Sequence, residues 1–599
     1  MPVVSSLPHW DMSVVYPGLA SQEFEQGCAG VVQDIDDLAR LFDTHHVMEQ
    51  PAAPLNDDTI RSFETVIERY NRVVEATVTL QTYILCIVST NTQDSLAQAK
   101  LSEMQQPLVT LRQLGTRFTA WIGSFDVDDL IARSTIAREH AFVLRKARLQ
   151  AAHLMTPPEE ALASELNVSG GTAWAKLHSD VTSQMTVLLE RDGEVQQLPM
   201  SMVRNMAYEG DREVRRKAYE AELAGWKQVA LPLAAAINSI KGQVNTVEQQ
   251  RGWSSVLEAS LLNSNIDRET LEAMLTAARE SFPDFRHYLQ AKARVLGLSR
   301  LAWYDLFAPV GKSEKVWEYD DAKAFVIEQF GTFSSRLADF AARAFREQWI
   351  DAEPRAGKLD GGYCAHLRKD ESRVFINFDP SYGGMSTLAH ELGHAYHNLN
   401  LVHRSALQRE TPMTLAETAS IFCETIVREA ALKNAGKEEQ ISILEASLQG
   451  SCQVVVDITS RFLFEQRIFE RRKQRELSIE ELNALMLEAQ SETYGDGLDA
   501  ALMHPYMWAM KPHYYDTDYS FYNYPYMFGL LFGLGLYARY QENPVSFTRV
   551  YDDLLSSTGL ADAATLAGQF GIDLRSVDFW RASLDIIRKD IARFEELTR

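Results

Sequence analysis

The stretch LAHELGHAYH at positions 388–397 decides how the rest of this chain is interpreted. On a helix, His390 and His394 lie four residues apart on one face, so that both imidazole rings can point at one cation. Glu391 then lies beside the cation, where a general base for a metal-bound water belongs. The spacing therefore predicts a site for metal-dependent hydrolysis.

The residues around this stretch favour a helix with one buried face. The two glycines at 383–384 predict a turn, and Ser386 or Thr387 is expected to cap the helix that follows. Leu388 and Leu392 form an apolar stripe about opposite the histidines, so one face can pack while the other faces a cavity or solvent. The alternative is a surface helix with two satisfied histidines, since such a string also arises by chance.

A third metal ligand is expected from a second helix further along the chain. Catalytic zinc usually has three protein ligands and one open position. The Thr-Pro pair at 411–412 predicts the start of a helix that runs to about Asn434, and Glu417, Ser420 and Glu424 share one face of it. Glu417 is the predicted third ligand, and Glu424 is a candidate to orient one of the imidazoles. Both glutamates could instead be solvated helix residues.

Length and composition indicate a large soluble protein with two or more domains. The chain has 599 residues, 46% hydrophobic and 24% charged, and its net charge of −23 disfavours nucleic acids and anionic membranes as partners. Its five cysteines are scattered without CxxC pairs, as is typical of reduced thiols. No secretory signal is visible, and the longest apolar run, 527–538, is too short to span a bilayer. We expect a cytoplasmic enzyme.

The fold class predicted from periodicity is mainly α. Helical patterns occupy 21–46 and 58–114, and two later helices are expected over 214–226 and 231–250. An Asp-Gly turn at 192–193 predicts a hairpin, which suggests a boundary near residue 200. The expected domains are therefore an N-terminal helical domain, 1–200, and a catalytic domain, 201–599.

A second hairpin is predicted just before the 388–397 helix. The period changes to two over 363–367 and 374–378, around a turn at 368–372. A free strand edge next to a metal site could bind an extended peptide through main-chain hydrogen bonds. Gly361 and Gly362 precede the hairpin and are candidate substrate contacts. The alternative is a hairpin that only covers the core.

Several of these segments resemble one known family. TLAHELGH at 387–394, ETPM at 410–413 and ETAS at 417–420 look like the oligoendopeptidase F branch of the thimet oligopeptidase and neurolysin family of zinc metallopeptidases. WDMS at 10–13, WYDLFAP at 303–309, GGYC at 361–364 and the block 508–529 resemble it too, so that most of the chain is covered. The resemblance implies a large multi-helix peptidase that encloses a deep cleft and admits short peptides.

The resemblance also implies roles for individual residues. One Zn²⁺ per chain would be held by His390, His394 and Glu417, with Glu391 as the general base. A histidine and tyrosines in the family's C-terminal segment stabilise the reacting carbonyl, and the matching stretch here is 513–526. The residues carried over are His513, Tyr519 and Tyr522. Tyr526 is a further candidate, because the spacing after the histidine differs from the family's pattern.

The expected function is hydrolysis of internal peptide bonds in short oligopeptides, by Glu391-assisted attack of a zinc-bound water. A zinc carboxypeptidase that trims free C-termini would use the same motif. An inactive peptide-binding protein with a vestigial motif is the alternative outside enzymes, although every ligand and the base are present.

Overall fold

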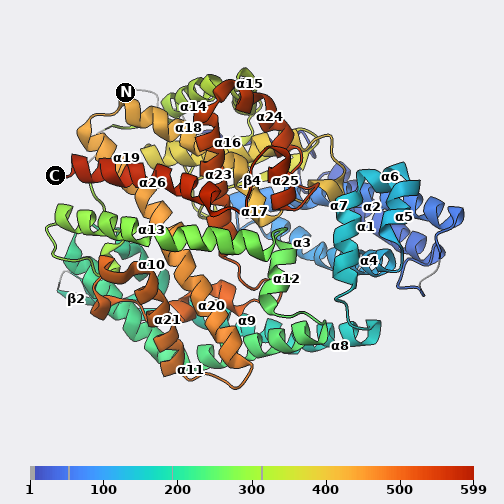
Figure 1. The fold of residues 1–599 in the computed structure, drawn as a ribbon, viewed down its shortest axis with the longest axis horizontal. Coiled ribbons are helices and arrows are strands. Elements are labelled where there is room, and N and C mark those ends of the chain that lie inside the picture. Colours follow the sequence, from blue (N-terminus) through green and yellow to red (C-terminus); the bar gives the residue numbers. More distant parts are fainter. Residues whose placement is uncertain (1–6, 52–53, 192, 312–314) are drawn as a thin grey trace. The chain divides into compact units, whose positions relative to one another are not determined.

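The structure is a computed structural model that describes residues 7–51, 54–191, 193–311 and 315–599. These residues are mostly helical and contain two small antiparallel or mixed sheets (Figure 1). The predicted fold class, mainly α with a small sheet next to the 388–397 helix, is confirmed. The enclosing cleft stays a prediction.

Contacts within the chain divide it into two units, each built from three segments. Unit 1 contains residues 1–154, 315–431 and 539–571, and unit 2 contains residues 155–314, 432–538 and 572–599. The predicted domain division at residue 200 rests on sequence pattern and stays a prediction. Residue 200 lies inside the 155–314 segment of unit 2, and each unit also contains residues from later in the chain.

Unit 1 carries the helix of the 388–397 stretch. Its elements are α1 (Gln22–Thr44), α2 (Asp57–Thr90), α3 (Ser95–Glu103), α4 (Gln105–Gly123), α5 (Val127–Arg133), α6 (Thr135–Glu139), α7 (Ala141–Ala151), α14 (Tyr319–Phe333), α15 (Ser335–Arg346), β3 (Ile350–Asp351), β4 (Tyr363–Arg368), β5 (Glu371–Phe375), α16 (Tyr382–Asn400), η3 (Ala406–Arg409), α17 (Met413–Ala416), most of α18 (Thr418–Asn434), α24 (Pro544–Leu555) and α25 (Ala563–Gln569).

Unit 2 is built around the longest helix of the described chain. Its elements are α8 (Pro157–Ser169), α9 (Gly171–Ser183), β1 (Thr186–Arg191), β2 (Glu194–Pro199), α10 (Met200–Asn205), η1 (Met206–Tyr208), α11 (Arg212–Gln250), α12 (Val256–Asn263), α13 (Arg268–Val295), η2 (Trp303–Asp305), α19 (Lys437–Cys452), the π-helix η4 (Gln453–Asp457), α20 (Ile458–Arg472), α21 (Ile479–Tyr494), η5 (Gly495–Gly497), η6 (Ala500–Leu502), α22 (Met507–Met510), η7 (Pro512–Tyr515), most of α23 (Tyr524–Glu542) and α26 (Val577–Leu597). Helices α13 and α26 run side by side (Figure 1).

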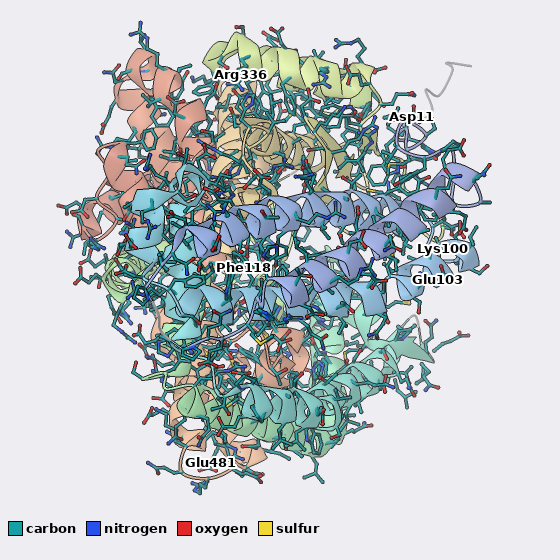
Figure 2. The ribbon with its side chains drawn as sticks, turned by 90° about the vertical axis from the view of Figure 1, so that its right-hand side faces the viewer. Asp11, Lys100, Glu103, Phe118, Arg336 and Glu481 are labelled. Atoms are coloured by element: carbon teal, nitrogen blue, oxygen red, sulfur yellow. The ribbon has the colours of Figure 1, made fainter. Side chains whose placement is uncertain are left out.

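The N-terminal helices of unit 1 pack around one hydrophobic core. Asn56 caps α2 by accepting from the backbone N–H of Thr59, and buried residues then recur along the helix from Ile60 to Tyr83. Phe118 of α4 joins this core, and Lys100 and Glu103 of α3 pair on its outside at 3.0 Å (Figure 2). By length and composition alone α2 could cross a membrane, but core packing accounts for its apolar face.

Both predicted hairpins form. Strands β1 and β2 pair antiparallel, although Asp192 of the expected turn lies outside the described residues. Strands β4 and β5 also pair antiparallel, with Tyr363 opposite Phe375. The turn between them is shorter than the predicted 368–372, because Glu371 already pairs with Arg368. In the sheet order β3-β5-β4, β4 is an edge strand.

The two helices predicted over 214–226 and 231–250 are wrong as separate elements. One helix, α11, continues from Arg212 to Gln250 through Pro232. Proline removes one backbone hydrogen bond and crowds the preceding turn. Leu233, Ala234 and Ile237 are buried directly after it, so packing of the apolar face holds the helix together across the proline.

Candidate metal centre and active site

The helix that carries the histidines begins earlier than the sequence predicted. Ser381, not Ser386 or Thr387, caps α16, since its hydroxyl accepts from the backbone N–H of Gly384 at 3.2 Å. Gly384 is therefore helical, and a Cβ there would lie 2.1 Å from the backbone oxygen of Asp379. This glycine is needed for close approach of the preceding loop and not for a turn.

The structure brings His390, His394 and Glu417 together. Glu417 Oε2 lies 3.2 Å from Nε2 of His390 and 3.2 Å from Nε2 of His394. One ligand atom from each of these residues lies within 4.8 Å of the other two. The two rings are 4.9 Å apart between centroids and nearly perpendicular, at 79°. Two imidazole nitrogens and one carboxylate oxygen converge on a single point.

Glu417 reaches this point because the predicted helix is interrupted at that residue. The segment expected to run unbroken from 411–412 to Asn434 consists of the single turn α17 and then α18, and Glu417 lies between them as the C-cap of α17. The hydroxyl of Ser420, in the first turn of α18, donates to Glu417 Oε2 at 2.7 Å. This hydrogen bond fixes the carboxylate that faces both imidazoles.

Close packing of α16 against α18 depends on Gly393, a position that the sequence pattern did not mark as important. A Cβ at Gly393 would lie 2.6 Å from the Cα of Ser420 and 2.7 Å from the backbone oxygen of Ala419. Real side chains do not approach a backbone so closely. The glycine between the ligands His390 and His394 is thus the position where α18 touches α16, and the signal for it was the glycine inside HELGH.

Glu424 and Ser386 hold the imidazole of His390 from its other side. The Nδ1–H of His390 donates to Glu424 Oε2 at 3.1 Å, and the hydroxyl of Ser386 donates to Glu424 Oε1 at 3.3 Å. A carboxylate on Nδ1 keeps a proton there, so that Nε2 is the nitrogen that can give up its proton and ligate an ion. Burial opposes the charged imidazolium, but the hydrogen bonds to Glu417 and Glu424 raise the pKa of His390 well above its usual range.

Glu391 is buried beside this cluster with one oxygen uncommitted. The residue is 6% exposed, and its Oε2 has no hydrogen-bond partner. Burial raises the pKa of its carboxyl. Gly362 lies against its other oxygen, since a Cβ at Gly362 would be 3.3 Å from Glu391 Oε1. A larger residue before β4 would press on the carboxylate, which gives Gly362 a packing role that Gly361, with open space around it, does not share.

His397, the third histidine of the stretch, is structural. It is 4% exposed, and its Nε2 lies 2.9 Å from the hydroxyl of Thr558 in the loop that follows α24. Burial lowers the pKa of His397 to about 4, so the ring is neutral at ordinary pH. It is three residues from His394 on α16, and its ring is held by Thr558.

The aromatic segment suggested by the resemblance, 513–526, lies in unit 2, and only some of its candidate residues contact one another. His513 stacks on Tyr522 with ring centroids 5.8 Å apart, and the hydroxyls of Tyr522 and Tyr526 are 2.7 Å apart. The amide of Asn523 donates to Nε2 of His513 at 2.7 Å. In the described chain Tyr519 makes no ring or hydroxyl contact with this group, and it is 60% exposed. The structure therefore groups His513 with Tyr522 and Tyr526.

His513 is held as a neutral imidazole. Burial lowers its pKa to about 2, and the neighbouring cations Arg461 and Lys511 act in the same direction. A neutral ring keeps one N–H, which can donate to a developing negative charge. The roles carried over to His513, Tyr519 and Tyr522 stay predictions.

The donor set fits zinc. Structural and catalytic zinc sites bind histidine nitrogen and carboxylate oxygen at about 2.0–2.2 Å, and catalytic sites use three protein ligands. Ligand atoms 3.2 Å apart are compatible with such bonds to one ion. The uncommitted Glu391 Oε2 beside the three ligands is the polar atom that a hydrolytic zinc site requires and a structural one does not.

Comparison with known proteins points to one family. Residues 205–586 match the model of peptidase family M3, and residues 123–186 match that of oligopeptidase F. An oligoendopeptidase F homolog of Lactococcus lactis is 22% identical over 98% of this chain and 97% of its own length. Oligopeptidase PepF of Bacillus subtilis is 24% identical over 74% of this chain and 67% of its own length.

Solved structures share the fold along nearly the whole chain. A peptidase from Chlamydophila abortus superposes with a TM-score of 0.81 at 20% identity, covering 98% of both chains. Oligoendopeptidase-F from Enterococcus faecium superposes with a TM-score of 0.66 at 18% identity, covering 96% of this chain and 99% of that one. Because the match to peptidase family M3 covers residues 205–586, more than half of the sequence, this chain belongs to that family.

Proposed function

We propose that the chain is a zinc-dependent endopeptidase that cleaves internal bonds of short oligopeptides. The observation that carries the proposal is the convergence of His390, His394 and Glu417 with the uncommitted carboxylate oxygen of Glu391 beside them. Relatives named oligoendopeptidase F and oligopeptidase support the substrate class.

The chain's own residues would act in a fixed order. Zinc, when bound by His390, His394 and Glu417, supplies a Lewis acid and lowers the pKa of water toward neutrality. Glu391 accepts the proton of the attacking water at Oε2 and returns it to the leaving amine. Its raised pKa suits this task, because a base whose pKa lies nearer neutrality can also act as the acid. His513 and a tyrosine, of which Tyr522 and Tyr526 are the grouped candidates, would donate to the oxyanion.

The peptide would bind along the free edge of β4. No strand of the described chain pairs with that side of β4, so its main-chain groups can accept an extended segment without reading its side chains. Gly362 at the start of the strand lies against Glu391, which links this edge directly to the proposed base. Binding through the main chain would explain cleavage of peptides with differing sequences.

Glu391→Gln tests the proposal. The amide preserves the shape of the side chain but cannot accept the proton, so turnover should fall about 10²–10⁴-fold while bound zinc stays at one ion per chain. Activity and metal content are measured on the same preparation, and a chelator should abolish wild-type activity. Wild-type turnover in the zinc-loaded variant would contradict the role of Glu391.

A peptide blocked at both ends separates the remaining alternatives. An endopeptidase cleaves a peptide that is acetylated at its N-terminus and amidated at its C-terminus, whereas a carboxypeptidase needs the free carboxylate. Cleavage of only the unblocked peptide would replace the proposal by a carboxypeptidase. Absence of hydrolysis from the zinc-loaded protein on a mixed peptide library would leave a peptide-binding protein.

The five cysteines are all unpaired, which supports a cytoplasmic location. Cell fractionation of the source organism, with detection of the intact chain, tests this part of the proposal. Recovery in the secreted fraction would contradict it.

A further inference from the structure

A cavity of about 220 Å³ is lined only by residues of unit 2, and no residue of the proposed metal site is among them. It is formed where α10, α11, α13, α20 and α22 meet, and the π-helix η4 supplies part of its wall. π-helical turns cost regular hydrogen bonding and occur often at functional sites. The proposed peptidase chemistry uses none of the residues that line this cavity.

The charged groups that line the cavity are four cations and two acids, Glu222 and Asp457. Arg215 pairs with Asp305 at 3.0 Å, and Arg461 pairs with Asp457. Arg204 approaches Glu222 at 3.6 Å. The remaining cation is Lys511, for which no ion pair or side-chain hydrogen bond is found in the described chain. The lining therefore carries two more cations than acids, and with Asp305 outside the lining as the partner of Arg215, Lys511 is the cation left without an acidic partner.

Unsatisfied polar atoms of the lining are mainly donors. The Nε atoms of Arg215 and Arg461 are buried without hydrogen-bond partners. Both ring nitrogens of His504 are also buried without partners, and its Nε2 comes no closer than 3.5 Å to Glu222. A buried donor without an acceptor costs about 1–3 kcal/mol. A ligand that brings acceptor oxygens would remove this cost, and a cationic ligand would add to it.

The size and the walls of the cavity favour an organic ligand. A volume of about 220 Å³ is far larger than the roughly 10–15 Å³ that one water molecule needs, and more than one inorganic ion fills. Trp303, Tyr304, Phe307 and Tyr494 line it and offer ring faces for an apolar group. Burial lowers the pKa of Lys511 to about 7, and Arg461 acts in the same direction, so a neighbouring anion would restore the charged ammonium.

We propose that this cavity binds a small carboxylate of one or two amino-acid residues, with the carboxylate at Lys511 and Arg461 and the side chain against the aromatic wall. Every peptide bond that a peptidase hydrolyses produces a new carboxylate of this kind, and this choice of ligand rests on the proposed function. The inference that the cavity binds an anion does not rest on the proposed function, because it follows from the charges and unpaired donors of the lining.

The site also has a physical connection to the predicted oxyanion group. Arg461 Nη1 donates to Asn523 Oδ1 at 3.3 Å, and the amide of Asn523 donates to Nε2 of His513 at 2.7 Å. A carboxylate that draws Arg461 toward the cavity would compete with this chain of hydrogen bonds. Occupancy of the cavity can therefore alter the orientation of His513.

Calorimetric titration of the zinc-loaded, full-length protein tests the site. The probes are N-acetyl-L-phenylalanine and N-acetyl-L-phenylalaninamide, which differ only in the carboxylate. We expect the acid to bind and the amide to bind at least about tenfold more weakly, because a charge-assisted contact is lost. Equal binding of acid and amide, or no binding of either, would overturn the proposal on the wild-type protein alone.

Variants assign the binding to Lys511. Lys511→Met should weaken the acid at least about tenfold, whereas Lys511→Arg should retain most of it. Lys227→Met is the matched control, because Lys227 is exposed on α11 in the same unit, and it should bind like the wild type. Thermal melting of each variant verifies folding. Wild-type affinity in a folded Lys511→Met protein would refute the assignment.

Kinetics with two peptides distinguish whether the bound carboxylate is the C-terminus of the substrate or a released product. If the cavity binds the end of the substrate itself, Lys511→Met raises KM for a peptide with a free C-terminus and leaves KM for its amidated form unchanged. If it binds a released product, the acid inhibits wild type on both peptides and inhibits Lys511→Met less. The titration is repeated with Glu391→Gln, whose binding should be retained, so that loss of the proposed catalysis and loss of the carboxylate site give separate results.

Discussion

The metal cluster of unit 1 and the buried ion pair of unit 2 use similar charged groups in opposite ways. His390, His394 and Glu417 keep 21–24% of their side-chain surface exposed, and their ligand atoms converge on one point. Lys241 of α11 and Glu465 of α20 are 0% and 1% exposed and bond to each other at 2.7 Å. Lys241 also lies over the ring of Phe469 at 4.5 Å. The three metal-site residues can still bind an ion, whereas Lys241 and Glu465 already balance each other's charge.

This difference separates charge kept for function from charge kept for structure. A buried pair gains from mutual attraction about what it loses in desolvation, so that removing one partner is costly while removing both is not. In the metal cluster a bound cation is the missing partner for Glu417 and the imidazoles. Substitutions in the two regions should therefore affect different measurements.

The largest effect is expected from loss of a metal ligand. His394→Ala leaves two ligands, which is too few for a catalytic zinc site, so the variant should lose its zinc on dialysis and have no measurable peptidase activity. Zinc content by elemental analysis is the direct measurement. His397→Gln changes the structural histidine of the same helix and should keep zinc, although it costs stability. Full zinc occupancy in His394→Ala would exclude this histidine as a ligand.

The buried pair should show the opposite pattern. Lys241→Met leaves the Glu465 carboxylate buried without a partner and should lower the free energy of unfolding by about 3–5 kcal/mol, with zinc content unchanged. Lys473→Met removes the ion pair between Glu470 of α20 and Lys473 directly after it. Their side chains are 71% and 48% exposed, so stability should change by less than about 0.5 kcal/mol.

The double variant Lys241→Met with Glu465→Leu decides whether charge is the cause. Because both charges are then gone, most of the lost stability should return, as measured by urea unfolding of all three proteins. A double variant less stable than Lys241→Met would show that packing and not the uncompensated carboxylate sets the cost.

The sequence could predict the metal cluster because its signal is local. Two histidines at helical spacing, with Glu417 at the start of a later helix, suffice to place three ligands. The break in the helix at Glu417 and the cap at Ser381 were missed, since both depend on contacts with other segments. The Lys241–Glu465 pair joins residues 224 positions apart, and nothing near either residue marks it. The cavity around Lys511 was invisible for the same reason.

The helix contact beneath the metal cluster gives a smaller effect that links the two measurements. Gly393→Ala adds a methyl group 2.6 Å from the Cα of Ser420, which would push α18 away from α16. We expect a loss of about 1–3 kcal/mol in stability and weaker zinc binding, because Glu417 moves with α18. Gly450→Ala is the control in α19, where a Cβ meets nothing within 4 Å and should be neutral or stabilising. Unchanged zinc affinity in Gly393→Ala would separate the helix contact from the ligand geometry.

Glu424 gives the smallest effect, confined to the metal. Glu424→Gln removes the charge that holds Nδ1 of His390 protonated and its Nε2 free, so zinc affinity should fall about 10–100-fold while the free energy of unfolding without metal stays nearly constant. Competition with a chromophoric chelator measures the affinity, and Glu328→Gln, at an exposed position of α14, is the control for loss of one negative charge. A carboxylate that only caps a hydrogen bond in the core, like the buried glutamate of unit 2, would show the reverse: lower stability and unchanged zinc affinity. The two measurements on this single variant therefore decide whether Glu424 belongs with the open cluster or with the completed pairs.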